Sequence, residues 1–149
     1  MRARVVASTL AELAELEIVM EFINPEGWER PRGYSNGVAA EGRQIFIAGQ
    51  IGWTPDHQVR EGFGAQVRQA FQNTVDVLAA AGARPEHLVR MTWFITDREA
   101  YSAAGREIGE AYKATIGKHF PAMTVVEVSR LLHDDALVEI ESAAVVPQD

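Results

Sequence analysis

The stretch "GFGAQVRQAFQNTVDVLAAAG" (residues 62–82) decides the fold class. It places apolar side chains three or four positions apart, on one stripe of a helix: Phe63, Val67, Phe71, Val75 and Leu78. Gly82 follows the last of them and suits the left-handed backbone conformation that ends many helices. The stretch therefore predicts an amphipathic helix whose apolar stripe packs against a second layer.

The residues that follow this helix predict a strand and then a second helix. "HLVRMTWFIT" (87–96) alternates apolar and more polar positions, with Val89, Met91, Trp93 and Ile95 on one side. Asp97 can then cap a helix that runs to about Ile116. A strand between two amphipathic helices requires further strands, because a single strand cannot form a layer.

Those strands are predicted on both sides of the central segment. "YSNGVAAEGRQIFIAGQIG" (34–52) predicts a hairpin around Glu41-Gly42, after an irregular loop over 24–33. "AMTVVEVSRL" (122–131) and "ALVEIESAAVV" (136–146) predict the last two strands. The order β-β-α-β-α-β-β favours an α+β fold with two helices on one face of a mixed sheet of about four to six strands. The other sheet face then needs cover, which implies a homo-oligomer.

The length and composition indicate one globular domain. A chain of 149 residues with 47% hydrophobic and 23% charged residues can bury one sizeable core. Residues 20–149 are interpreted as that domain. Residues 1–19 end just before Met20, so they either precede the domain's own start or form a short helix on Leu10, Leu13 and Leu16. We interpret them as a peripheral extension without a catalytic role.

Several classes of function are disfavoured by what the chain lacks. The net charge of −7 without a basic run argues against nucleic-acid binding. No apolar stretch reaches the roughly 20 residues that cross a bilayer, so no membrane partner is expected. The absence of cysteine excludes disulfides and thiolate chemistry and fits a cytoplasmic location. The four histidines lack ligand spacing, so neither a metal nor another cofactor is expected.

Five segments resemble the RidA/YjgF family of small trimeric proteins, historically also labelled endoribonuclease L-PSP. They cover about residues 24–146 in unbroken order: "GYSNGV", "IFIAGQIG", "FQNTVDVLAAAGARPEHLVRMTWFITD", "FPAMTVVEVSRL" and "ALVEIESAAV". The resemblance implies a chorismate-mutase-like two-layer fold and a homotrimer whose sheets close into a central barrel. It also implies clefts for small molecules at the subunit interfaces, and hydrolysis of reactive imines or enamines to carbonyl compounds and ammonia.

The chain departs from this family at the substrate carboxylate. Deaminase members read Pro-Ala-Arg-Ser where this chain reads Pro121–Thr124, with Met123 in place of the arginine. A guanidinium can hold a carboxylate with two charge-assisted hydrogen bonds, whereas methionine has no donor. Met123 is therefore either ordinary packing or a specificity substitution next to Thr124. Arg32 is the alternative carboxylate ligand, since it shares a side with Tyr34 in extended backbone, unless it only pairs with an acidic residue at the subunit rim.

Other positions retain the family's pattern. Glu139 in "LVEIES" matches the glutamate thought to position or activate water, and is the candidate catalytic residue. Glu141, on the same strand face, is either a second site carboxylate or a solvated one. Tyr34 matches the tyrosine that lines the cleft, or is an interface tyrosine. Gly49 and Gln50 match the family's Ser-Gly-Gln, with Ala48 replacing the serine. The second helix lacks the family's asparagine; Gly105 or Gly109 lies nearest its position.

Two functions follow as hypotheses. The first is a RidA-like enamine or imine deaminase with altered specificity, for example for a conjugated, aminomuconate-like acid. The second is a non-catalytic trimer of the same fold that binds a small metabolite. A ribonuclease activity would rest only on the old family label, and the acidic charge speaks against it.

Overall fold

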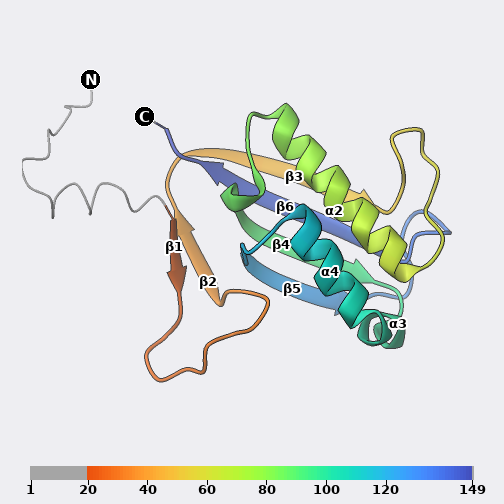
Figure 1. The fold of residues 1–149 in the computed structure, drawn as a ribbon, viewed down its shortest axis with the longest axis horizontal. Helices are drawn as coiled ribbons and strands as arrows, with labels where there is room; N and C mark the ends of the chain where they lie inside the picture. The colour runs from red at the N-terminus through yellow and green to blue at the C-terminus, as the bar shows by residue number, and fades with distance from the viewer. Residues whose placement is uncertain (1–19, 149) are drawn as a thin grey trace, which may run out of the picture.

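The structure is a computed structural model that describes residues 20–148, so the interpretation of residues 1–19 lies outside the described part. It is an α+β fold of two layers (Figure 1). The strands are β1 (Met20–Ile23), β2 (Gly37–Ala40), β3 (Arg43–Ile51), β4 (Leu88–Ile95), β5 (Ala122–Glu127) and β6 (Val138–Val146). The helices are α2 (Phe63–Ala80), the 3-10 turn η1 (Pro85–His87), α3 (Arg98–Ala103) and α4 (Gly105–Thr115).

The main sheet has four strands in the order β3-β6-β4-β5, and β4 and β5 are its parallel pair. The longer helices α2 and α4 both cover one face of this sheet, as the sequence predicts (Figure 1). The opposite face, which we call the open face, carries no helix among the described residues. Within residues 20–148, no helix is long and apolar enough to cross a membrane.

The core lies between the sheet and α2. Phe63, Val67, Phe71 and Leu78 are buried and Val75 is half-buried, which confirms the predicted stripe. The helix ends where predicted: Gly82 has a φ of 71°, and the Ala83 amide donates to the Leu78 carbonyl at 2.8 Å. On β4, three of the residues predicted to share one side of the strand are buried beneath the helices: Met91, Trp93 and Ile95. Leu88 is buried in place of Val89, because the β4–β6 register shifts between Leu88 and Arg90.

Two predictions about the chain path were wrong. The strands over 34–52 do not form a hairpin: β2 pairs with β1 in a separate two-stranded sheet, and β3 pairs with β6. The reason is that Ile45 and Ile47 bury their side chains under α2 when β3 joins the main sheet, which leaves β2 for the unpredicted strand β1. The second helix is also divided, into α3 and α4 at Ala104. Asp97 nevertheless caps α3, accepting from the Ala100 amide at 3.0 Å.

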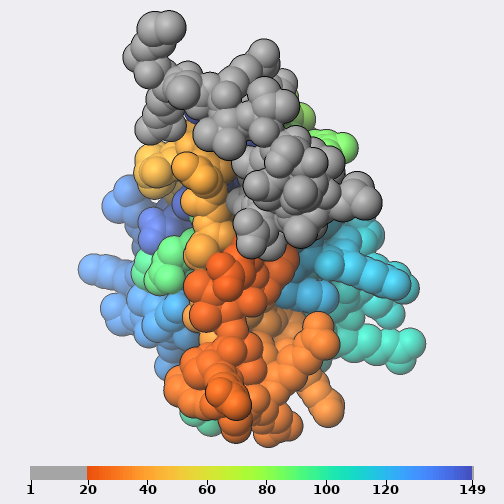
Figure 2. Space-filling model, turned by 90° about the vertical axis from the view of Figure 1, so that its left-hand side faces the viewer, coloured from red at the N-terminus to blue at the C-terminus, as the bar shows by residue number. Residues whose placement is uncertain are grey.

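The pair β1–β2 and the loop between its strands stand at one end of the molecule. Figure 2 shows this segment, in orange, beside the cyan and light-blue residues of the chain between α4 and β5. The two segments are joined by hydrogen bonds, since the Ser35 amide donates to the Pro121 carbonyl at 3.0 Å and the Ser35 hydroxyl donates to the Phe120 carbonyl. This contact fixes the loop that carries Arg32 and Tyr34 against the start of β5.

Candidate functional site

A cavity of about 510 Å³ lies where the 31–34 loop meets the edge of the sheet and α4. We call it the edge cavity. Its volume is within the range of small-molecule sites in proteins, roughly 300–1,000 Å³. The lining residues come from the loop, α3, α4, β4, β5 and the turn after α4: Arg32, Gly33, Tyr34, Trp93, Tyr101, Gly105, Ile108, Gly109, Tyr112, Lys113, Gly117, Lys118, Phe120, Met123 and Val125.

Met123 lies in the wall of the edge cavity. It pairs with the fully buried Met91 in the parallel β4–β5 register, so its side chain is on the helix-covered face of the sheet. It is half-buried and packs against the core. The two interpretations from the sequence therefore do not exclude one another, because Met123 packs against the core and also faces the space that a ligand would fill.

Arg32 and Tyr34 line the same cavity from the loop. The bonds of Ser35 to Phe120 and Pro121 bring this loop to β5 although the two segments are far apart in sequence. Tyr34 is 43% exposed, so its ring is available at the mouth of the cavity. Arg32 is exposed and makes no ion pair with another described residue. The alternative in which Arg32 serves a surface salt bridge has no partner within this part of the chain.

The turn between α4 and β5 is closed by Tyr112. Its hydroxyl donates to the His119 carbonyl, and its ring stacks on Phe120 with centroids 5.5 Å apart and an interplanar angle of 6°. Burial raises the pKa of Tyr112 above its ordinary value, so the phenol keeps its proton at neutral pH. Tyr112 is consequently a positioning group for Phe120 and not a proton acceptor.

Glu139 lies on the open face, away from the edge cavity. It pairs with Phe94 across the β4–β6 ladder, whereas its neighbour Ile140 pairs with Trp93 under the helices. The Glu139 carboxylate lies directly over Gly49, where a Cβ would come within 2.8 Å of both Cγ and Cδ of the glutamate. A bulge in β3 between Ile47 and Gln50 creates this approach. Glu139 is half-buried and has no hydrogen bond or ion pair to another residue of 20–148.

Gln66 on α2 fixes the start of the strand that carries Glu139. Its side-chain amide donates to the carbonyls of Arg60 and Asp135, both at 3.0 Å, and its oxygen accepts from the Leu137 amide at 2.8 Å. Gln66 is buried, and these three bonds satisfy it in full. Gln66 was not singled out in the sequence, because nothing in its local pattern indicates which distant backbone groups it meets.

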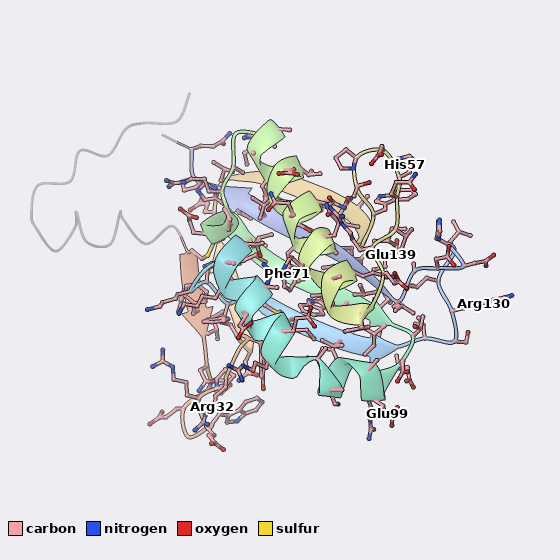
Figure 3. All side chains as sticks on the ribbon, turned by 45° about the vertical axis from the view of Figure 1, so that its right-hand side comes forward. Arg32, His57, Phe71, Glu99, Arg130 and Glu139 are labelled. Atoms are coloured by element: carbon pink, nitrogen blue, oxygen red, sulfur yellow. The ribbon has the colours of Figure 1, made fainter. Side chains whose placement is uncertain are left out.

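The other predicted site residues are divided between the two faces. Thr124 pairs with Thr92 on the open face and is exposed. Gln50 is half-buried and bonds its own strand, donating to the Ala48 carbonyl at 3.0 Å. Figure 3 shows Arg32 and Glu139 in separate parts of the molecule. Within one chain the predicted site residues therefore form two groups: Arg32, Tyr34 and Met123 in the edge cavity, and Gly49, Gln50, Thr124 and Glu139 outside it.

The edge cavity also contains residues that sequence reasoning missed. Lys113 and Lys118 are exposed and line its mouth, and Trp93 forms part of its buried wall. Gly105 and Gly109, the two positions considered opposite the family's asparagine, both line it. Lys113 and Lys118 are the only lysines of the sequence, and this was the one feature by which the sequence could have pointed to them. Among residues 20–148, no group of three or more His, Cys, Asp or Glu side chains is arranged to hold a metal ion.

Comparison with known proteins places the chain in a family. Residues 29–146 match the family described as endoribonuclease L-PSP. The chain belongs to this family. A RutC family protein of Pyrococcus horikoshii is 35% identical over 127 residues, which cover 83% of this chain and 96% of the relative. A 2-iminobutanoate/2-iminopropanoate deaminase of Salmonella typhimurium is 33% identical over 108 residues, covering 70% of this chain and 80% of the relative.

Solved structures support the same assignment. A protein of the conserved Rid family from Yersinia pestis, described as of unknown function, superposes with a TM-score of 0.76 at 29% identity. The match covers 86% of this chain and 99% of that protein. The resemblance to the RidA/YjgF family and the α+β fold class predicted from the sequence are confirmed. The family includes imine deaminases, so a RidA-like activity is supported at the level of the family.

Proposed function

We propose that this protein is a RidA-like deaminase that hydrolyses an enamine or imine to a carbonyl compound and ammonia, with a substrate specificity different from that of the arginine-containing members. The observation that carries this proposal is the Glu139 carboxylate. It is half-buried over Gly49 and has no partner among the described residues, so it is available to a water molecule or a substrate.

The chemistry needs one group that moves protons. Water is a weak nucleophile towards an imine carbon, and the nitrogen must gain protons before ammonia can leave. The Glu139 carboxylate would accept a proton from the attacking water and return it to nitrogen. Hydrolysis then consumes one water per C=N bond and requires no oxidant or cofactor.

The separation of the two residue groups favours a site shared between chains. Glu139 lies on the open face and Met123 on the helix-covered face, so one chain alone does not bring them together. A homotrimer in which the open faces pack inward would set Glu139 of one chain against the edge strand of the next. We propose that this assembly completes the site, in agreement with the interface clefts that the family resemblance implies.

The test is ammonia release from a panel of enamines and imines, measured with the wild-type protein and with Glu139→Gln. The amide keeps the shape of the side chain but cannot accept the proton, so we expect a rate loss of roughly 10²-fold or more with ligand binding retained. Gly49→Ala should also lower the rate, because its Cβ displaces the carboxylate.

The control for these variants is Glu99→Gln, which removes an equal charge from an exposed position on α3, far from Glu139 in Figure 3. Its rate should match that of the wild type. Unchanged turnover in Glu139→Gln would remove Glu139 from the mechanism.

The second hypothesis, a non-catalytic metabolite-binding trimer, is favoured by one observation. The family arginine is replaced by Met123, which lines the edge cavity without any hydrogen-bond donor. This hypothesis predicts no ammonia release from any compound of the panel, while ligands still raise the thermal denaturation temperature of the protein.

A further inference from the structure

The charges around the edge cavity all have one sign. Its charged lining residues are Arg32, Lys113 and Lys118, and no Asp or Glu lines it. This is unusual in a chain with 21 acidic and 14 basic residues, and both lysines of the sequence are used here. None of the three cations forms an ion pair with another residue of the described part of the chain. The cavity therefore has a positive mouth on an acidic protein, which attracts anions.

The walls of the edge cavity are aromatic. All three tyrosines of the sequence line it, together with one tryptophan and one phenylalanine: Tyr34, Trp93, Tyr101, Tyr112 and Phe120. The Trp93 and Tyr101 rings meet edge to face at 6.2 Å and 87°, next to the stacked pair of Tyr112 and Phe120. Four glycines in the lining contribute no side chain and leave space between these rings: Gly33, Gly105, Gly109 and Gly117. Aromatic walls of this kind favour a flat, apolar ligand.

One polar atom in these walls has no partner. Trp93 is 3% exposed, and its indole nitrogen, Nε1, makes no hydrogen bond with any described residue. The other buried polar group of the wall, the Tyr112 hydroxyl, is already bonded to His119. Buried donors in folded proteins are nearly always satisfied, so this indole nitrogen is an exception within the wall.

We propose that the edge cavity binds a small planar carboxylate, whose conjugated or aromatic part lies between the rings and whose carboxylate is held by Lys113 and Lys118. Arg32 also lines the cavity, and a second hollow shares Arg32, Lys118 and Phe120 with it. The lysines would thus take the role of the family's arginine, whose position is occupied by Met123 in this chain. This proposal names a substrate class for the site of the proposed function. It rests on the proposed function for the reaction, whereas the binding of the carboxylate requires no turnover.

Isothermal titration calorimetry with three probe compounds tests the proposed ligand class. trans-Cinnamate has a flat conjugated body and a carboxylate, cinnamamide has the same body without charge, and acetate has the charge without the body. We expect cinnamate to bind about tenfold or more tightly than either of the other two. Equal affinity for cinnamate and cinnamamide would overturn the role of the cations, and equal affinity for cinnamate and acetate would overturn the role of the rings.

Variants then test the two lysines. Lys113→Gln and Lys118→Gln should each weaken cinnamate binding by about 3- to 30-fold, since both residues are exposed and their charges are partly screened. Cinnamamide binding should not change. The matched control is Arg68→Gln, which removes a positive charge from an exposed position of α2 outside the cavity and should leave both affinities unchanged. Unchanged cinnamate binding in both lysine variants would refute the assignment.

The outcomes for binding and turnover are separate. If cinnamate binds through the lysines but no enamine or imine releases ammonia, the deaminase proposal fails and the ligand class stands for a binding protein. If ammonia is released from uncharged substrates at rates that the lysine substitutions leave unaltered, the deaminase proposal stands and the carboxylate inference fails.

Discussion

Under the proposed function, Met123 would determine which anions the edge cavity can hold close to the sheet. Its side chain is half-buried, packs on the core and lines the same cavity as Arg32, Lys113 and Lys118, whose lining contains no carboxylate. A thioether adapts to a flat apolar ligand but offers no charge to a short one. The carboxylate of a small imino acid bound next to Met123 would have no partner. The carboxylate of a longer acid would reach the lysines at the mouth of the cavity.

Met123→Arg tests this difference. A guanidinium at this position should raise the affinity for pyruvate, a short carboxylate, by about tenfold or more, because a charge-assisted hydrogen bond contributes roughly 1.5–3 kcal/mol. It should also lower the affinity for cinnamate, whose body would lose space. Calorimetry measures both affinities, and Met123→Leu is the control that keeps volume without charge. A loss of thermal stability with no gain for pyruvate would mean that Met123 serves only the core.

Individual site residues could be predicted only where a local pattern pointed to them. Tyr34 and Met123 belong to segments that resemble the family, and both line the edge cavity. The position of Lys118 could not be predicted in this way, because it depends on the turn after α4 folding back beside the 31–34 loop. The alternation placed Trp93 on one side of its strand with Met91 and Ile95, but it does not reveal that its Nε1 lacks a partner.

At the scale of elements, α2 lacks a cap of its own. Its N-cap residue, Gly62, has no side chain, and the first turn contains no acidic residue. The Glu107 carboxylate of α4 lies instead against Gly64 in that first turn, where it would collide with a Cβ. A negative charge near the positive end of the helix dipole is stabilising. The contact also ties α4, which carries five of the fifteen residues that line the edge cavity, to α2.

Glu107→Gln should therefore lower the free energy of unfolding by about 0.3–1 kcal/mol, since the helix dipole loses its counter-charge. Urea denaturation at low ionic strength measures the change, which should shrink at high salt. The control is Asp134→Asn, an equal loss of charge on an exposed loop. If both substitutions changed the free energy of unfolding equally, the effect would come from the net charge of the protein and not from the helix dipole.

The elements themselves followed from periodicity more reliably than their partners did. The stripe of α2 and the alternation of β4 are local signals, and both elements form within a few residues of the expected bounds. The pairing of β3 with β6 instead of β2 is a choice between distant segments of similar composition. Local pattern cannot decide it, because the energy comes from burying Ile45 and Ile47 against α2.

At the scale of the whole molecule, the open face of the sheet is not covered by any helix among the described residues. Phe46 on β3 is 77% exposed there, and Val126 on β5 is 39% exposed. Large contiguous patches of exposed apolar side chains mark contact surfaces between proteins. The proposed trimer would cover them and bring Glu139 to the edge cavity of a neighbouring chain.

Phe46→Lys tests this assembly. The wild-type protein should have a mass of three times 16.4 kDa by light scattering at micromolar concentration, because the open face is covered only in the assembly. A lysine at position 46 places three like charges at one centre and should shift the mass towards that of one chain. Ammonia release should fall with it, since the proposed site needs two chains. Val77→Lys, on the exposed side of α2, is the control and should keep both mass and activity. A single-chain mass for the wild type would remove the basis for a shared site, and full activity in a monomeric Phe46→Lys variant would place the reaction within one chain.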